Sequence, residues 1–147
     1  MIESNREIKK PSEKREIMPR FEASALRGYC VSVLTASGVE RSCAEAVADA
    51  LIDAELTGVS THGVSRLAVY MQRMDAGVMS RENNIRIVRE STSTLVVDAG
   101  NSLGAAAAKF AMERCIAKAK ETGCCFASVH SSNHFGTAAY YTRLAAA

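Results

Sequence analysis

An alanine-rich segment, residues 103–121, is followed almost directly by a short apolar run, and together they limit the possible folds of this chain. A helix with this sequence carries a stripe of mostly small side chains on or near one face: Leu103, Ala107, Phe110, Ala111, Cys115 and Ala119. Such a stripe lets a helix lie close against a sheet. Gly123 is expected to end the helix, and Cys124–Val129 then has the continuous apolar character of a strand buried on both faces. The sequence therefore predicts an α/β fold in which a helix packs on a sheet.

Three helices are predicted ahead of any strand. Apolar residues recur at three- and four-residue steps in three segments: Phe21–Ala36, Cys43–Leu56 and Leu67–Met74. A glycine follows each segment and is expected to end the helix. Ser42 and Glu45 have the spacing of a capping box, so the second helix is expected to start at about Cys43.

Two β-rich segments follow the helices. Ile85–Val88 and Thr94–Asp98 are expected to pair as a hairpin. At the other end, Gly136–Ala147 returns to helix-forming sequence and stops without a cap or a stop signal. We therefore expect the sequence to be a fragment of a longer chain.

The chain is expected to have three parts. Residues 1–19 are polar and charged with little periodicity, which predicts a flexible N-terminal extension. Residues 20–80 contain the first three predicted helices. Residues 81–147 contain the predicted strands and the two later helices.

The composition is that of a folded globular protein, and it argues against two classes of partner. Hydrophobic residues make up 48% and charged residues 23% of the 147 residues. The net charge of +2, from 18 basic and 16 acidic side chains, is too balanced for a nucleic-acid-binding surface or an anionic membrane partner. No segment approaches the roughly 20 apolar residues of a membrane-spanning helix, and the N-terminus lacks the apolar core of a signal peptide. We expect a cytoplasmic protein.

The cysteines are odd in number and lack CxxC spacing: Cys30, Cys43, Cys115, Cys124 and Cys125. They mostly fall within apolar segments, where cysteine behaves as a small buried hydrophobe. We predict structural thiols and no metal site.

The histidines lie in predicted loops, where a substrate can reach them. His62 precedes the third predicted helix, and Arg66 lies four residues on, so the two side chains can point into one pocket. A guanidinium grips a carboxylate through two parallel hydrogen bonds, and an imidazole exchanges a proton with the oxygen on the adjacent carbon. Thr61 supplies a hydroxyl that can orient the ring or cap the helix. The set suits a substrate with a carboxylate beside a carbonyl or hydroxyl.

The same residues also have a plainer interpretation. Thr61 then merely caps the helix, His62 is a surface residue and Arg66 is a solvated charge. A second polar segment, Asn133–Thr137, follows the predicted buried strand and precedes a helix. It either presents backbone N–H groups to a phosphate or ribose, or forms an ordinary polar turn.

Two other functions stay open on the residues alone. His130 and His134 are four residues apart, and with His62 they would supply the three histidines of a metal-dependent hydrolase or lyase. No acidic residue adjoins these histidines in sequence to fix their tautomers. The other alternative is a non-catalytic helical interaction module, which leaves the two histidine-glycine loops unexplained. Neither a G-x-G-x-x-G nor a Walker A motif occurs, so a dinucleotide would not bind through the usual Rossmann fingerprint.

Two motifs together resemble the malate/L-lactate dehydrogenase family, which includes ureidoglycolate dehydrogenase, diketogulonate reductase and sulfolactate dehydrogenase. They are the segments Gly58–Leu67, read as GVSTHGVSRL, and Ser132–Gly136, read as SNHFG. The segment Asp98–Ala119 looks like the turn and alanine-rich helix of that family. The resemblance covers about residues 20–147.

The resemblance implies a non-Rossmann α/β fold. Residues 20–80 would form a helical substrate and dimerisation segment, and residues 81–147 an incomplete nicotinamide-binding domain around a mixed sheet. Family members are more than twice as long, so further cofactor and substrate contacts are expected beyond Ala147. The full-length protein is expected to be a homodimer.

The implied activity is hydride transfer between NAD or NADP and a small 2-oxo or 2-hydroxy acid. By resemblance, His62 is the proton donor to the substrate oxygen and Arg66 binds the substrate carboxylate. The histidine at His134 is itself the acid/base in some family members. The cofactor-contacting loop matches five consecutive residues: His134, Phe135, Gly136, Thr137 and Ala138.

Two departures from the family pattern lie beside His62. Ser60 stands where the family often has aspartate, and Thr61 replaces an orienting serine, keeping the hydroxyl with narrower rotamers. The resemblance leaves the substrate open among lactate, malate, ureidoglycolate, sulfolactate and a cyclic imine. A catalytically inactive remnant of such an enzyme is a further alternative.

Overall fold

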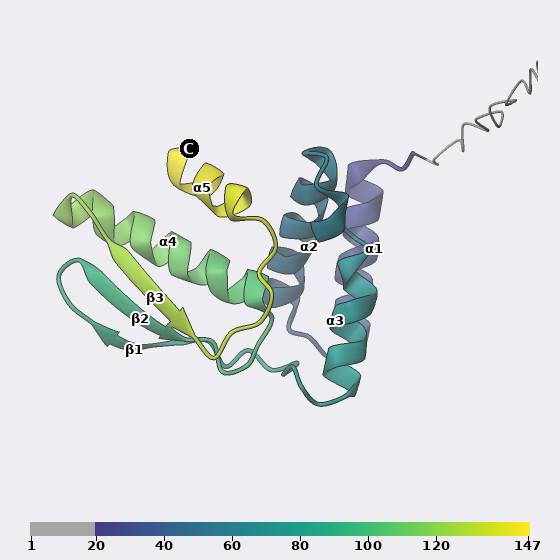
Figure 1. The fold of residues 1–147 in the computed structure, drawn as a ribbon, viewed down its shortest axis with the longest axis horizontal. Coiled ribbons are helices and arrows are strands. Elements are labelled where there is room, and N and C mark those ends of the chain that lie inside the picture. The colour runs from purple at the N-terminus through teal and green to yellow at the C-terminus, as the bar shows by residue number, and fades with distance from the viewer. Residues whose placement is uncertain (1–19) are drawn as a thin grey trace, which may run out of the picture.

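Residues 20–147 are described by the computed structural model, and the predicted extension at residues 1–19 lies outside them. A cluster of helices lies on one side and a helix-covered sheet on the other (Figure 1). The helical cluster contains α1 (Ala23–Ala36), α2 (Arg41–Leu56), the short helix η1 (Ser60–His62) and α3 (Arg66–Asp75). The sheet part contains β1 (Arg86–Glu90), β2 (Thr94–Asp98), α4 (Gly104–Thr122), β3 (Phe126–His130) and α5 (Ala138–Ala146). The helices, the hairpin and the strand after the alanine-rich helix therefore occur in the predicted order.

Helix α2 lies at the centre of the helical cluster and connects it to the sheet part. Nine of its sixteen residues are buried, and five of these are alanines. Alanine lets neighbouring helices approach closely, and α1, α4 and α5 all pack against α2. One cluster of buried apolar side chains consequently extends from Leu34 in α1 through Leu51 and Tyr70 to Tyr141 in α5.

The predicted capping box at the start of α2 is wrong. The helix begins at Arg41, and Glu40 occupies the N-cap position without a side-chain capping hydrogen bond. Ser42 instead donates its hydroxyl hydrogen bond to Glu40 Oε1 at 2.6 Å, and Glu45 pairs with Arg41 at 2.9 Å. The spacing of a capping box was present, but the helix starts early enough to place both side chains inside its first turns.

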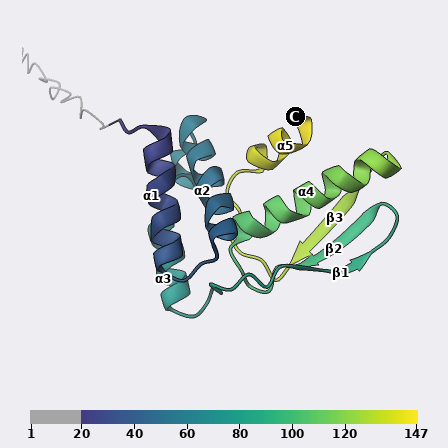
Figure 2. The ribbon, with the colours of Figure 1, turned by 180° about the vertical axis from the view of Figure 1, so that it is seen from behind.

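The sheet is mixed, with strand order β1-β2-β3. β1 and β2 form the predicted antiparallel hairpin, and β2 pairs with β3 in parallel. Helix α4 makes the crossover between the two parallel strands and covers one face of the sheet (Figures 1 and 2). Because parallel strands end at the same edge, the segment after β2 and the segment after β3 lie side by side.

Helix α4 packs on β2 through small residues, as its sequence predicts. Leu95 and Val97 of β2 are almost fully buried beneath it, and Ala107 and Ala111 of α4 are buried as well. Gly123 ends the helix at a φ of 85° and donates its N–H to the Ala119 carbonyl at 2.8 Å. A left-handed residue at this position favours glycine, which explains the sharp end of the helix.

The prediction that the apolar run after α4 is buried on both faces is wrong for the described chain. Four of the five residues of β3 are exposed, including Phe126 at 68% and Val129 at 36%. Among residues 20–147, β3 is an edge strand with α4 on one face only. A continuous apolar sequence shows that both faces of a strand are suited to burial. Both faces are buried only where another layer packs on each of them.

The fold class is α/β, as predicted. Within residues 20–147, no helix combines the length and the apolar character needed to cross a bilayer. All five cysteines are free, and Cys30 and Cys43 are buried in the helical cluster.

Candidate functional site

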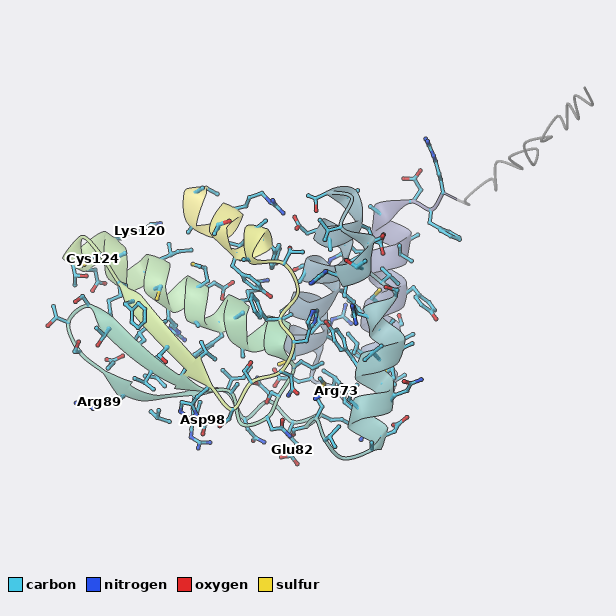
Figure 3. All side chains as sticks on the ribbon, in the orientation of Figure 1. Arg73, Glu82, Arg89, Asp98, Lys120 and Cys124 are labelled. Carbon is cyan, nitrogen blue, oxygen red and sulfur yellow. The ribbon has the colours of Figure 1, made fainter. Side chains whose placement is uncertain are left out.

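The predicted site residues meet where the connection between β3 and α5, residues 131–137, passes alongside α3. This connection runs from the sheet toward the helical cluster and lies against the start of α4 (Figure 1). Figure 3 labels Arg73 on α3 and Asp98 at the end of β2, on either side of this region. The motif before α3 and the motif after β3 therefore come together although they are far apart in sequence.

Asn133 fixes the connection to the segment after β2. Its Nδ2 donates at 3.0 Å to three oxygens: Asn101 O, Asn101 Oδ1 and Ser102 O. Its Oδ1 accepts a hydrogen bond from Arg73 Nη2 at 3.3 Å. One amide side chain thus ties α3, the β2–α4 turn and the β3–α5 connection together.

Gly104, the first residue of α4, allows this close approach. A Cβ at this position would lie 2.1 Å from the Asn133 carbonyl oxygen and 2.5 Å from that of His134. No side chain fits there without moving the backbone that carries His134.

His134 lies between the side chains of Tyr70 and His62. Its Nδ1 is 2.8 Å from the Tyr70 hydroxyl, and its ring centroid is 5.2 Å from that of His62. The pKa of His134 is lowered from its ordinary value by desolvation, then by His62 and Arg66. The ring is therefore neutral at neutral pH and can give or take a proton.

His62 is the last residue of η1, and Thr61 lies directly against it. The Thr61 hydroxyl is 3.0 Å from His62 Nδ1. No side-chain capping hydrogen bond starts α3, so the hydroxyl contacts the imidazole rather than capping the helix.

Glu55 holds the turn after His62 in place. Its Oε1 accepts the Val64 N–H at 2.7 Å, and a Cβ at Gly63 would lie 2.0 Å from the same oxygen. A side chain at the position after His62 would therefore displace the Glu55 carboxylate from its hydrogen bond to Val64.

Arg66 lies beside the histidines at the start of α3. Its Nε donates to the Thr61 carbonyl at 2.6 Å, which holds the guanidinium back against η1. Arg66 and Arg73 line an open pocket of about 370 Å³ together with Tyr70, Asn133 and His134. Among residues 20–147 neither arginine forms an ion pair, so the pocket offers positive charge to an anionic ligand.

The segment predicted to contact a cofactor forms the end of this connection and the start of α5. Phe135 is 43% exposed, and Thr137 is the N-cap residue of α5 without a side-chain capping bond. The Thr137 hydroxyl is buried and has no hydrogen-bond partner among the described residues. An orphaned hydroxyl at a helix N-terminus next to an exposed aromatic ring fits a polar, partly aromatic group such as a nicotinamide nucleotide.

The third histidine, His130, does not form a metal-ligand set with His62 and His134 in the described part of the chain. His130 ends β3, with its Nδ1 3.0 Å from Ser131 Oγ and 3.8 Å from Asp98 Oδ1. Within residues 20–147, no group of three His, Cys, Asp or Glu side chains is arranged to hold a metal ion. The alternative of a three-histidine metal site therefore receives no support from the geometry.

Sequence reasoning missed Tyr70, Asn133 and Gly104 as parts of the site. Tyr70 falls within the apolar periodicity of Leu67–Met74, which predicts burial, and it is 3% exposed. Its position four residues after Arg66 places both on one helix face, a signal that was available. The contacts of Asn133 and Gly104 depend on the tertiary fold and had no signal beyond their place in polar, glycine-containing segments.

Comparisons with known proteins agree with these observations. The sequence profile described as malate/L-lactate dehydrogenase matches residues 21–147. L-sulfolactate dehydrogenase from Methanothermobacter thermautotrophicus is 39% identical over 129 residues, which are 88% of this chain and 37% of the relative. Malate/(S)-sulfolactate dehydrogenase from Methanothermus fervidus is 35% identical over 119 residues, 81% of this chain and 35% of the relative.

The fold is also similar to that of a solved relative. The structure of malate dehydrogenase from Pyrococcus horikoshii has a TM-score of 0.84 at 38% identity, over 87% of this chain and 37% of that one. The chain thus spans a little over a third of the length of the relatives that it matches. Because the family profile extends across nearly all of residues 20–147 and the fold agrees, the chain belongs to the malate/L-lactate dehydrogenase family of enzymes.

Proposed function

We propose that this chain forms part of the active site of a nicotinamide-dependent oxidoreductase that interconverts a small 2-hydroxy acid and its 2-oxo acid. The observation that carries the proposal is the placement of His62 and His134 with ring centroids 5.2 Å apart, beside Arg66 and Arg73. The named relatives act on malate or sulfolactate, both of which are 2-hydroxy acids with anionic groups. An arrangement of two neighbouring imidazoles beside guanidinium groups that form no ion pair within residues 20–147 suits such a substrate.

In this proposal each side chain has a separate task. Arg66 binds the carboxylate of the 2-oxo acid. His62 gives its proton to the carbonyl oxygen during reduction and takes it back during oxidation, with the Thr61 hydroxyl at Nδ1 orienting the ring. His134 is the alternative acid/base. A nicotinamide cofactor held by residues 134–138 would supply the reversible hydride chemistry at the carbonyl carbon.

The residues His134, Phe135, Gly136, Thr137 and Ala138 would hold the cofactor. Thr137, whose buried hydroxyl has no hydrogen-bond partner among residues 20–147, and the first N–H groups of α5 would supply polar contacts, and Phe135 offers an exposed ring. This set fits both NAD and NADP.

The remaining assignments belong to the same proposal. Residues 20–80 serve substrate binding and dimerisation, and residues 81–147 form part of the nicotinamide-binding domain. The full-length protein is a cytoplasmic homodimer with a small-molecule acid as substrate.

The direct test is an assay of the purified full-length protein that carries this chain. Oxidation of NADH and NADPH is followed with oxaloacetate, pyruvate, sulfopyruvate and other 2-oxo acids. Turnover with at least one of them is expected. Failure with every acid and both cofactors, in a protein shown to be folded by its melting curve, would contradict the proposal.

His62→Ala tests the proton donor. A positioned general acid contributes about 10²–10⁴ in rate, so kcat should fall by that factor while KM changes little. His130→Ala is the matched control, because His130 lies at the end of β3 against Asp98. If His62→Ala keeps full turnover and His134→Ala does not, the donor role passes to His134.

Arg66→Lys tests carboxylate binding in the same assay. Lysine keeps the charge but loses the planar fork, so KM for the acid should rise by about tenfold, with a smaller change in kcat. An unchanged KM would remove Arg66 from the substrate site.

A further inference from the structure

The contact between Tyr70 and His134 links the core of the helical cluster to the pocket. Tyr70 is 3% exposed, and its hydroxyl lies 2.8 Å from His134 Nδ1 across 64 sequence positions. The two ring centroids are 6.0 Å apart. Tyr70 belongs to the large buried apolar cluster, so its ring has a fixed position from which the hydroxyl reaches out to the imidazole.

The direction of this hydrogen bond follows from the partners of the hydroxyl. Among residues 20–147, the Tyr70 hydroxyl has one hydrogen-bond partner, His134 Nδ1. If Nδ1 carried a proton and donated it, the hydrogen of this 3%-exposed phenol would have no acceptor among residues 20–147, which is costly. Burial also raises the pKa of Tyr70 to about 12, so the phenol keeps its proton at neutral pH. The phenol therefore donates, and Nδ1 accepts.

A neutral imidazole that accepts at Nδ1 carries its proton on Nε2. Three groups other than Tyr70 bear on the ring: His62 beside it, Arg66 on α3, and Arg73, which holds the neighbouring Asn133. Both arginines are cations, and neither offers an acceptor that would favour a proton on Nδ1. Neither arginine therefore opposes the tautomer that Tyr70 selects.

We propose that Tyr70 is a positioning residue that holds His134 in the Nε2–H tautomer and so makes Nε2 the nitrogen that gives or takes a proton in the pocket. The catalytic part of this inference rests on the proposed function. The tautomer itself does not, because it is a property of the protein without substrate or cofactor.

The first test is a long-range proton–nitrogen NMR spectrum of the full-length protein with isotopically labelled histidine, recorded above neutral pH without ligand. His134 is assigned by the loss of its signals in His134→Gln. We expect the Nε2–H pattern in the wild-type protein. The Nδ1–H pattern, or an even mixture of the two tautomers, would overturn the inference without the need for any tyrosine variant.

Tyr70→Phe removes only the hydroxyl and should shift His134 toward a mixture of tautomers. Tyr141→Phe is the matched control: Tyr141 is equally buried, and its hydroxyl donates to the Phe135 carbonyl in the same connection without contacting the His134 ring. The control should keep the Nε2–H pattern. If both variants change the tautomer, the effect is a general loosening of the connection and the positioning role is wrong.

Kinetics separate this inference from the proposed function. In an active protein, Tyr70→Phe should lower kcat by about tenfold, with little change in the KM of the cofactor, because a fraction of the protein holds the wrong tautomer. Unchanged kcat together with a changed tautomer would overturn the catalytic part. A protein that turns over no 2-oxo acid but shows the expected tautomer shift would contradict the proposed function and leave the Tyr70 contact established.

Discussion

His134 is a residue whose surroundings oppose its charged form. Desolvation by the β3–α5 connection and α3 lowers its pKa first, and the nearby His62 and Arg66 lower it further. Near-neutral proton exchange requires an imidazole that is not locked in its protonated state. The same environment therefore suits catalysis and gives the folded protein a measurable pH dependence.

The first prediction concerns stability in mildly acidic solution. The unfolded chain protonates His134 at its ordinary pKa of 6.5, whereas the folded protein resists protonation until a lower pH. The contribution is thus fully present above pH 6.5 and is lost as the pH falls from there toward the folded pKa. Melting temperatures measured from neutral pH downward should decline in this window, and the decline should be smaller in His134→Gln.

The carboxyl group of Asp98 affects stability only at a lower pH than His134 does. The N–H of Gly100 is the main cause of the lowered pKa of Asp98, and Arg86 and His130 add to it. The contribution of Asp98 is present above its ordinary pKa of 3.8 and is lost only below it. Wild-type and His134→Gln proteins should therefore show the same loss in strong acid. If the melting temperatures of the two proteins also fell equally steeply with pH above pH 5, the assignment to His134 would be contradicted. Asp98 titrates below this region, because pH 5 lies roughly one unit above its ordinary pKa.

At the scale of elements, the start of α4 is the part that sets the position of the site. The helix packs on β2 through alanines, and its first residue, Gly104, touches the backbone of Asn133 and His134. The position of His134 relative to His62 therefore depends on how closely a helix N-terminus approaches the connection after β3.

Gly104→Ala should push that connection away. Overpacking of this kind costs about 1–3 kcal/mol, so the free energy of unfolding should fall by that amount and the NMR signals of His134 should shift. Gly28→Ala is the control, since Gly28 lies inside α1 with no atom within 4 Å of a built Cβ. That change should stabilise the protein by about 0.5–1 kcal/mol, because glycine is unfavourable in a helix interior. Unchanged stability and unchanged His134 signals in Gly104→Ala would show that the connection accommodates a methyl group.

At the scale of the whole described chain, one carboxylate joins three helices. Asp49 on α2 accepts from Arg27 on α1 at 2.6 Å and from Lys109 on α4 at 3.5 Å. The pKa of Arg27 is raised, chiefly by its hydrogen bond to Asp49. These ion pairs lie beside the apolar contacts that join the helical cluster to the helix over the sheet.

Asp49→Asn should therefore destabilise the protein by about 1 kcal/mol, the upper part of the range for partly exposed pairs. The loss should shrink at high salt. Salt weakens the Asp49 ion pairs of the wild-type protein, so the substitution then removes less stabilisation. Glu45→Gln removes an exposed pair within α2 and should change stability by no more than about 0.5 kcal/mol. Chemical unfolding of the three proteins at low and high salt provides the comparison, and equal losses in both variants would contradict the bridging role of Asp49.

Most of the fold was predictable because its signals are local. The helical periodicities, the hairpin segments and the alanine stripe of residues 103–121 each determine an element through the chain's own spacing. The errors have one cause. The burial of β3 and the start of α2 depend on neighbouring layers and on competing side-chain contacts, which spacing does not encode.

The α/β class, the order of the elements, the family and the two polar motifs that contain His62 and His134 all follow from signals in the sequence. The three-dimensional packing, in contrast, brings these motifs together, places Tyr70 rather than an acidic residue against His134, and leaves no room for a side chain at Gly104. The physical reason is that local propensities act over a few residues, whereas a site arises where segments far apart in the chain are brought into contact by packing of the core.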